Sequence, residues 1–86
     1  MFYVYMLESE RGAHYVGFTG DLKRRLIEHN HDRNFSTKNH KWTIIYYEAC
    51  LDELDARRRE KWLKTTHGGR MLKRRLKEYL YKRRAG

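Results

Sequence analysis

Two tyrosines and an arginine are spaced so that they could act together on an anionic group. Tyr5 and Tyr15 are ten positions apart, and Arg25 follows ten positions later. A phenol can exchange a proton, and a guanidinium binds phosphate or carboxylate oxygens in a bidentate manner. Tyrosines that pack in the core with hydrogen-bonded hydroxyls would produce the same sequence pattern, so the spacing alone does not distinguish a functional site from core packing.

Glu60 is a candidate metal ligand. It borders the apolar side of an expected helix, and Mg²⁺ needs only one or two carboxylates when substrate phosphate and water fill its other positions. An ion-paired surface glutamate among the arginines at 57–59 explains the same residue. A phenol with an ordinary pKa of ~10 is a weak base at neutral pH. A nearby arginine and a metal would favour the phenolate, so a tyrosine base, Arg25 and a metal at Glu60 form one hypothesis.

His29 follows Arg25 by four positions, which places both on one side of a helix. His29 could relay a proton or contact phosphate, or it could bond a carbonyl. His29 and His31 cannot share a metal on a helix, because positions two apart point about 200° from each other. With a single cysteine, Cys50, the chain lacks zinc-ligand spacing, and we expect a reducing cytoplasm without a signal peptide or membrane span.

The charge of the chain favours a polyanionic partner. Its 86 residues carry 20 Lys+Arg against 11 Asp+Glu, a net charge of +9. This excess favours nucleic acid first and an anionic membrane second. The basic side chains expected to contact phosphates without reading sequence are Lys23, Arg24, Lys38, Lys41, Arg58, Lys73 and Arg74.

The pattern of apolar residues predicts a single domain over 1–86 with the order β-β-α-β-α-α. Strands are expected at 2–7, 14–18 and 42–48, the first two as an antiparallel hairpin. Helices are expected at about 21–31, from Asp52 to about Thr65, and at about 70–82 after a break at Gly68-Gly69. The fold class is α/β (α+β), with three helices flanking a three-stranded sheet.

The motifs together resemble the GIY-YIG nuclease superfamily, in its small single-domain bacterial branch, which is similar to the N-terminal domain of excinuclease C. The likeness covers almost the whole chain. It is carried by Val4-Tyr5-Met6-Leu7, the run from Tyr15-Val16-Gly17 to Leu26, Glu28-His29-Asn30, Ile45-Tyr46-Tyr47-Glu48, Arg59 to Lys64, and Gly69 to Lys73.

The resemblance implies an antiparallel sheet and Mg²⁺- or Mn²⁺-dependent cleavage of DNA. It makes Tyr5, Tyr15, Arg25 and His29 the catalytic residues and Glu60 the metal ligand. Either tyrosine could activate the attacking water, and we favour Tyr15.

Similar members carry asparagine where this chain has Arg74, and the first motif has Tyr3 where glycine is expected. The expected function is a DNA endonuclease of repair or recombination. The alternatives are a nucleic-acid-binding module with reduced or lost catalysis, and an adaptor in a repair complex.

Overall fold

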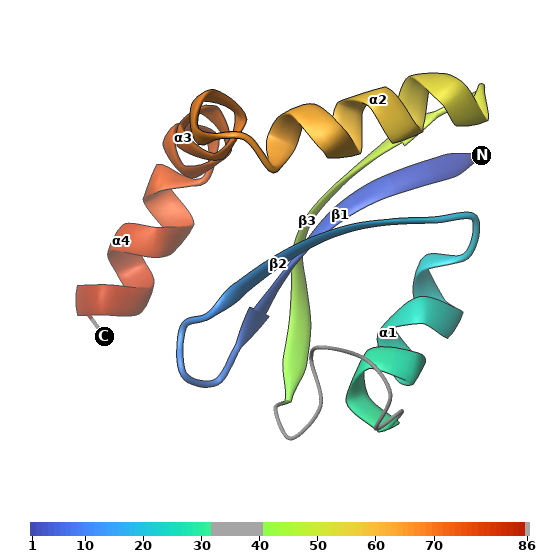
Figure 1. Cartoon of the computed structure of the whole chain (residues 1–86). Coiled ribbons are helices and arrows are strands. Elements are labelled where there is room, and N and C mark those ends of the chain that lie inside the picture. Colours follow the sequence, from blue (N-terminus) through green and yellow to red (C-terminus); the bar gives the residue numbers. More distant parts are fainter. Residues whose placement is uncertain (32–40, 86) are drawn as a thin grey trace.

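The chain folds around an antiparallel three-stranded sheet, which confirms the expected fold class. The computed structural model describes residues 1–31 and 41–85. The strands are β1 (Phe2–Ser9), β2 (His14–Thr19) and β3 (Trp42–Cys50). Their order is β2-β1-β3, so the strand that carries Tyr5 is central and pairs with both neighbours (Figure 1).

The described residues form four helices beside the sheet, one more than the sequence pattern predicts. They are α1 (Leu22–His31), α2 (Glu53–Leu63), α3 (Thr66–Arg75) and α4 (Lys77–Ala85). Asp21 begins α1, because its Oδ1 accepts the backbone N–H of Arg24 at 3.1 Å. Asp52 caps α2 in the same way through Leu54.

The predicted break at Gly68-Gly69 is wrong, because both glycines lie inside α3. The hydroxyl of Thr65 accepts the backbone N–H of Gly68 at 3.1 Å and starts this helix. A Cβ on Gly68 would collide with the carbonyl oxygen of Trp62 and lie 2.7 Å from Cα of Leu63. Glycine therefore permits close contact between α2 and α3 here, and tertiary packing overrides its low helix propensity.

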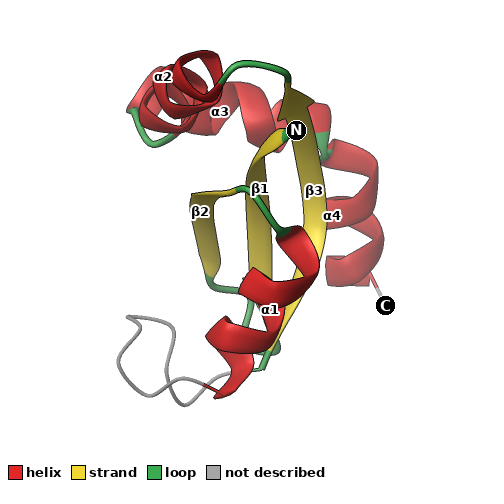
Figure 2. Cartoon of the chain, turned by 90° about the vertical axis from the view of Figure 1, so that its right-hand side faces the viewer, coloured by secondary structure: helices red, strands yellow, loops and turns green. Residues whose placement is uncertain are grey.

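The two faces of β1 carry separate clusters of apolar side chains. Val4 and Met6 pack with residues of α2 and α3, whereas Tyr5 and Leu7 pack with Trp42 and residues of α1. The alternation expected along this strand is therefore present. Helix α1 lies on one side of the sheet, and α3 and α4 lie on the other (Figure 2).

Strand β3 contains an irregularity that the sequence pattern does not reveal. Met6 pairs with Tyr46, but Leu7 pairs with Ile44, so one extra residue lies in β3 at this point. The extra residue reverses the alternation on β3. Ile44 and Tyr47, an odd number of positions apart, consequently face the same side as Tyr5.

Glu8 fixes the C-terminal helix to the sheet. Its carboxylate is buried and accepts a hydrogen bond from Tyr79 Oη at 2.6 Å, with Arg83 Nε at 2.5 Å and His14 Nε2 at 3.0 Å. Burial acts to raise the pKa of Glu8, but the bonds from Tyr79 and His14 and the charge of Arg83 outweigh it and hold this pKa below its ordinary value. The ionised carboxylate therefore stabilises the docking of α4.

Candidate active site

The central strand, β2 and α1 bring three of the expected site residues together. Tyr5 Oη lies 2.8 Å from Nε2 of His29, and both side chains are buried, with exposed fractions of 3 % and 2 %. The ring of Tyr15 lies 4.8 Å from that of His29 and 6.4 Å from that of Tyr5, measured between centroids. We call Tyr5, Tyr15 and His29 the aromatic cluster.

Gly17 makes room for the aromatic cluster. It lies directly opposite Tyr5 in the strand register. A Cβ at this position would collide with Oη of Tyr5, lie 2.5 Å from its Cζ and lie 3.0 Å from Cε1 of Tyr15. The glycine inside β2 therefore serves the close approach of a side chain from the neighbouring strand.

The two tyrosines of the cluster differ in burial and therefore in chemistry. Burial, the neighbouring Tyr15 and the charge of Glu60 raise the pKa of Tyr5, and the charge of Arg25 opposes them only in part. Tyr5 consequently holds its proton more firmly than an ordinary phenol. Tyr15 is only partly buried, so its ring reaches the surface of the protein.

His29 is held in its neutral form. Burial lowers the pKa of His29, the charge of Arg25 lowers it further, and Glu28 opposes them. A neutral imidazole has one ring nitrogen that accepts, and the contact with Tyr5 at 2.8 Å allows the phenol to donate to it. The cluster thus combines a protonated phenol with a neutral histidine.

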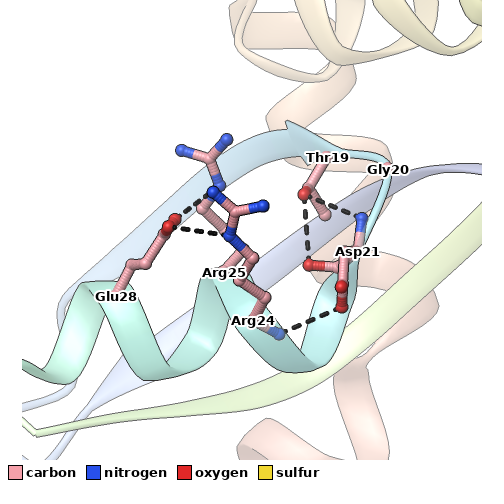
Figure 3. Close-up of a pocket in the computed structure, with 6 residues that line it drawn as sticks. All are labelled: Thr19, Gly20, Asp21, Arg24, Arg25 and Glu28. Carbon is pink, nitrogen blue, oxygen red and sulfur yellow. Dashed lines mark hydrogen bonds and ion pairs between the residues drawn. The ribbon is translucent and has the colours of Figure 1, made fainter.

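Arg25 lines a pocket at the start of α1 (Figure 3). The pocket is formed by Thr19, Gly20, Asp21, Arg24, Arg25 and Glu28. Glu28 lies 3.5 Å from Arg25 Nε and 3.2 Å from Arg24 Nε, so one carboxylate holds both guanidinium groups. The motifs alone assign no role to Glu28, although its spacing of three and four positions from the two arginines indicates these pairs.

Glu60 lies on α2 and influences the aromatic cluster through its charge. Its side chain is 22 % exposed and accepts a hydrogen bond from Lys64 Nζ at 2.9 Å. The three preceding arginines pair with other carboxylates: Arg57 with Glu53, Arg58 with Asp55 and Arg59 with Glu48. Glu60 is therefore ion-paired, as its alternative interpretation expects, but with Lys64 and not with the neighbouring arginines.

A divalent cation fits Glu60 as a single carboxylate ligand. The side chain is partly exposed, and its charge acts on Tyr5. The described residues contain no group of three or more His, Cys, Asp or Glu side chains that could enclose an ion. A cation at Glu60 would accordingly take its remaining ligands from water and substrate phosphate, as Mg²⁺ commonly does.

The expected phosphate contacts do not all lie on one surface. Lys23 and Arg24 are exposed on α1, whereas Lys73 and Arg74 are exposed on α3, which packs against the opposite face of the sheet. Lys41 and Arg58 are also exposed, and Lys38 lies outside the described residues. Among those of these residues that the structure describes, only Arg24 lines the pocket at Arg25.

The fold and this cluster define the class of the protein. The chain belongs to the GIY-YIG family, since the model of the GIY-YIG catalytic domain matches residues 1–73. No solved structure matches the chain. None of the helices in the described residues is both long and apolar enough to cross a bilayer.

Its relatives are UPF0213 proteins. The one from Streptococcus pneumoniae serotype 4 is 35 % identical over 69 residues, covering 72 % of this chain and 65 % of that protein. The one from Streptococcus agalactiae serotype V is 37 % identical over 65 residues, covering 67 % and 68 %. The one from Halobacterium salinarum is 32 % identical over 62 residues, covering 70 % and 80 %. The chain spans only 56 % and 51 % of the relatives from Desulfotalea psychrophila and Bacillus pumilus.

Proposed function

We propose that this chain is a single nuclease domain that hydrolyses DNA phosphodiester bonds with Mg²⁺ or Mn²⁺. The observation that carries the proposal is the aromatic cluster, in which residues from β1, β2 and α1 meet within electrostatic reach of Arg25 and Glu60. A core built for packing alone has no need of a buried phenol–imidazole pair beside ionised groups. The net charge of +9 provides the attraction for DNA.

Tyr15 is the proposed general base. It is the more exposed phenol of the cluster, whereas burial raises the pKa of Tyr5. In its ionised form Tyr15 takes the proton of the attacking water. The water oxygen forms a bond to phosphorus, the bond from phosphorus to the leaving oxygen breaks, and the leaving oxygen takes a proton from solvent. Tyr5 acts as a positioning residue that orients His29, and His29 in turn supports the ring of Tyr15.

Arg25 and Glu60 supply the charges that the reaction needs. Arg25 binds the phosphate at the pocket of α1 and stabilises the negative charge that develops on its oxygens. Glu60 would hold the divalent ion, which when bound neutralises the phosphate and stabilises the leaving oxygen. Lys64 must release Glu60 for this to occur, and a cation offers the carboxylate a stronger partner than an exposed lysine.

A binding module with reduced or lost catalysis is the second candidate. It is favoured by Arg74, which occupies the position where we expect asparagine and lies exposed on α3. An adaptor role in a repair or recombination complex is a variant of the same candidate. We place either function in the cytoplasm, which fits a single, partly buried free cysteine, Cys50.

Cleavage of nicked, branched and intact DNA with Mg²⁺ or Mn²⁺ tests the proposal. We expect products from the wild type, and a loss of at least about 100-fold in Glu60→Gln and Arg25→Ala. Glu53→Gln is the matched control, because Glu53 also lies on α2 and also pairs four positions along the chain. If the wild type yields no more product than Glu60→Gln on every substrate, the chain is not a nuclease.

Binding in EDTA separates the second candidate from the first. A binding module should retain DNA affinity without metal and lose it steeply as salt increases, because its contacts are phosphate contacts. Retained binding with no products would favour the module. A pull-down that recovers a stable repair protein would favour the adaptor.

A further inference from the structure

A second pair of tyrosines lies beside the aromatic cluster on the same face of the sheet. Tyr47 on β3 is directly opposite Tyr5, and Tyr3 precedes Tyr5 by two positions on β1. Directly opposite side chains and side chains two apart point to the same face. The rings of Tyr3 and Tyr47 meet edge to face, with centroids 6.0 Å apart and planes at 65°. We call these two residues the tyrosine platform.

The tyrosine platform is open to solvent. The side chain of Tyr47 is 56 % exposed, although it shares a face with the buried residues Tyr5, Leu7 and Trp42. Helix α1 crosses only part of this face and leaves the start of β1 and the end of β3 without a helix in front of them (Figure 2). The ring of Tyr5 lies over Gly17, on the side away from β3, so it does not cover Tyr47.

We propose that Tyr47, supported by Tyr3, stacks against an unpaired nucleobase next to the phosphate bound at Arg25. The inference rests on the proposed function for the identity of the ligand as DNA. Opposite positions on antiparallel strands place Cβ atoms about 5 Å apart, so Tyr47 directly adjoins Tyr5, on which the charge of Arg25 acts. The platform and the phosphate pocket thus lie within the reach of neighbouring nucleotides.

The chemistry of stacking defines the class of substrate. Bases inside an intact duplex already stack on one another, so an exposed ring can take only a base that has left the helix. Stacking on an aromatic ring tolerates any base, because every base has a π-face. The expected substrates are therefore DNA ends, flaps or junctions with an unpaired nucleotide, without sequence preference.

Single exposed tyrosines are common on protein surfaces. Tyr47 differs because it is supported by a second ring, faces the site and belongs to a chain with a charge of +9. The same charge disfavours a second copy of the chain as the occupant, since two copies would repel each other. DNA has both bases that can stack on the aromatic surface and phosphates that the positive charge attracts.

A binding experiment in EDTA tests the platform without requiring catalysis. The probes are a DNA flap carrying 2-aminopurine in its first unpaired nucleotides and a fully paired duplex of the same length. We expect quenching of 2-aminopurine by the wild type, and a loss of affinity for the flap of about fivefold or more in Tyr47→Ala. Tyr47→Phe should retain both, because stacking needs the ring and not the hydroxyl.

Tyr81→Ala is the control for removal of an exposed tyrosine, since Tyr81 is 71 % exposed on α4. Equal flap affinity in Tyr47→Ala and Tyr81→Ala would overturn the inference. An equal loss of affinity for the flap and for the duplex in Tyr47→Ala would also overturn it. A wild-type dimer that Tyr47→Ala abolishes would do the same, because a second copy of the chain would then cover Tyr47. If the wild type cleaves nothing but quenching still depends on Tyr47, the nuclease proposal fails and the platform stands.

Discussion

Gly17 is the position at which one methyl group should disable the aromatic cluster. In Gly17→Ala the new Cβ would lie 2.5 Å from Cζ of Tyr5 and 3.0 Å from Cε1 of Tyr15. Carbon atoms in contact are normally about 3.5–4.0 Å apart. The ring of Tyr5 must therefore move by about 1 Å or β2 must move away from β1.

Neither movement is easy in this structure. Tyr5 is 3 % exposed, and a shift of its ring would lengthen the bond to His29, which is 2.8 Å. Moving β2 would break the pairing of Tyr5 with Gly17. Forcing an extra methyl group into such a site costs about 1–3 kcal/mol. In a domain of this size, each kcal/mol lowers Tm by about 4–8 °C.

The effect on cleavage should exceed the effect on folding. A displacement of about 1 Å in a catalytic group can cost about 100-fold in rate. We therefore expect Gly17→Ala to remain folded with a lowered Tm and to lose about 100-fold in cleavage of the best substrate at a temperature well below that Tm. Thermal unfolding by circular dichroism and a single-turnover cleavage assay measure the two effects.

Gly20→Ala is the matched control for folding, because a Cβ at Gly20 meets no atom within 4 Å. Its Tm should stay within about 3 °C of the wild type, since exposed substitutions usually change stability by less than ~0.5 kcal/mol. Since Gly20 lines the pocket at Arg25, the control for cleavage is Gly69→Ala on α3, whose Cβ meets only Leu63 O at 3.9 Å. If Gly17→Ala is as stable as Gly20→Ala and as active as Gly69→Ala, Tyr5 does not need its observed position, and the reasoning from close packing fails.

Two further predictions concern stability. Gly68→Ala should destabilise the fold by about 1–3 kcal/mol, because its Cβ would collide with α2. Gly69→Ala, whose Cβ meets only Leu63 O at 3.9 Å, should stabilise the fold by up to about 1 kcal/mol. Urea unfolding measures both changes, and changes of the same sign would contradict the packing argument. Because folding lowers the pKa of Glu8, its contribution should be complete above its ordinary pKa of 4.5 and disappear as pH falls through the folded value. Glu8→Gln should lower stability at pH 7 and flatten this acid-side decline, and an unchanged decline would show that Glu8 does not cause it.

The sequence predicts the sheet well because its signal is local. Alternating side chains along β1 separate Val4 from Tyr5, and the structure places them in different clusters. The continuous α3 could not be predicted, because glycine propensity is a local preference and the close contact of Gly68 with α2 is a tertiary one. The extra residue in β3 is equally invisible, since β-branched and aromatic residues occur on both sides of it.

The candidate site, like the fold, can be predicted from the sequence only in part. Spacing and the family resemblance together select Tyr5, Tyr15 and His29, which the structure brings into contact. Spacing cannot show which of the two tyrosines is more exposed, because burial depends on which helix covers which end of the sheet. It also could not show that Tyr47 would share their face, since this depends on the extra residue in β3.

The irregularity in β3 links the fold to the proposed substrate. If the register between Trp42 and Ser9 continued along β3 without the irregularity, Tyr46 would lie opposite Tyr5, and Tyr47 would point to the other face. Tyr46 now lies on the other face, where its hydroxyl donates to Glu48 at 2.7 Å, and it cannot offer a free ring there. The irregularity thus directs the hydroxyl of Tyr46 to the ion pair of Glu48 with Arg59 and leaves the ring of Tyr47 exposed beside the candidate active site. Such irregularities are common beside active sites, where they re-aim a side chain, and this one aims an aromatic ring at the position of the neighbouring nucleotide.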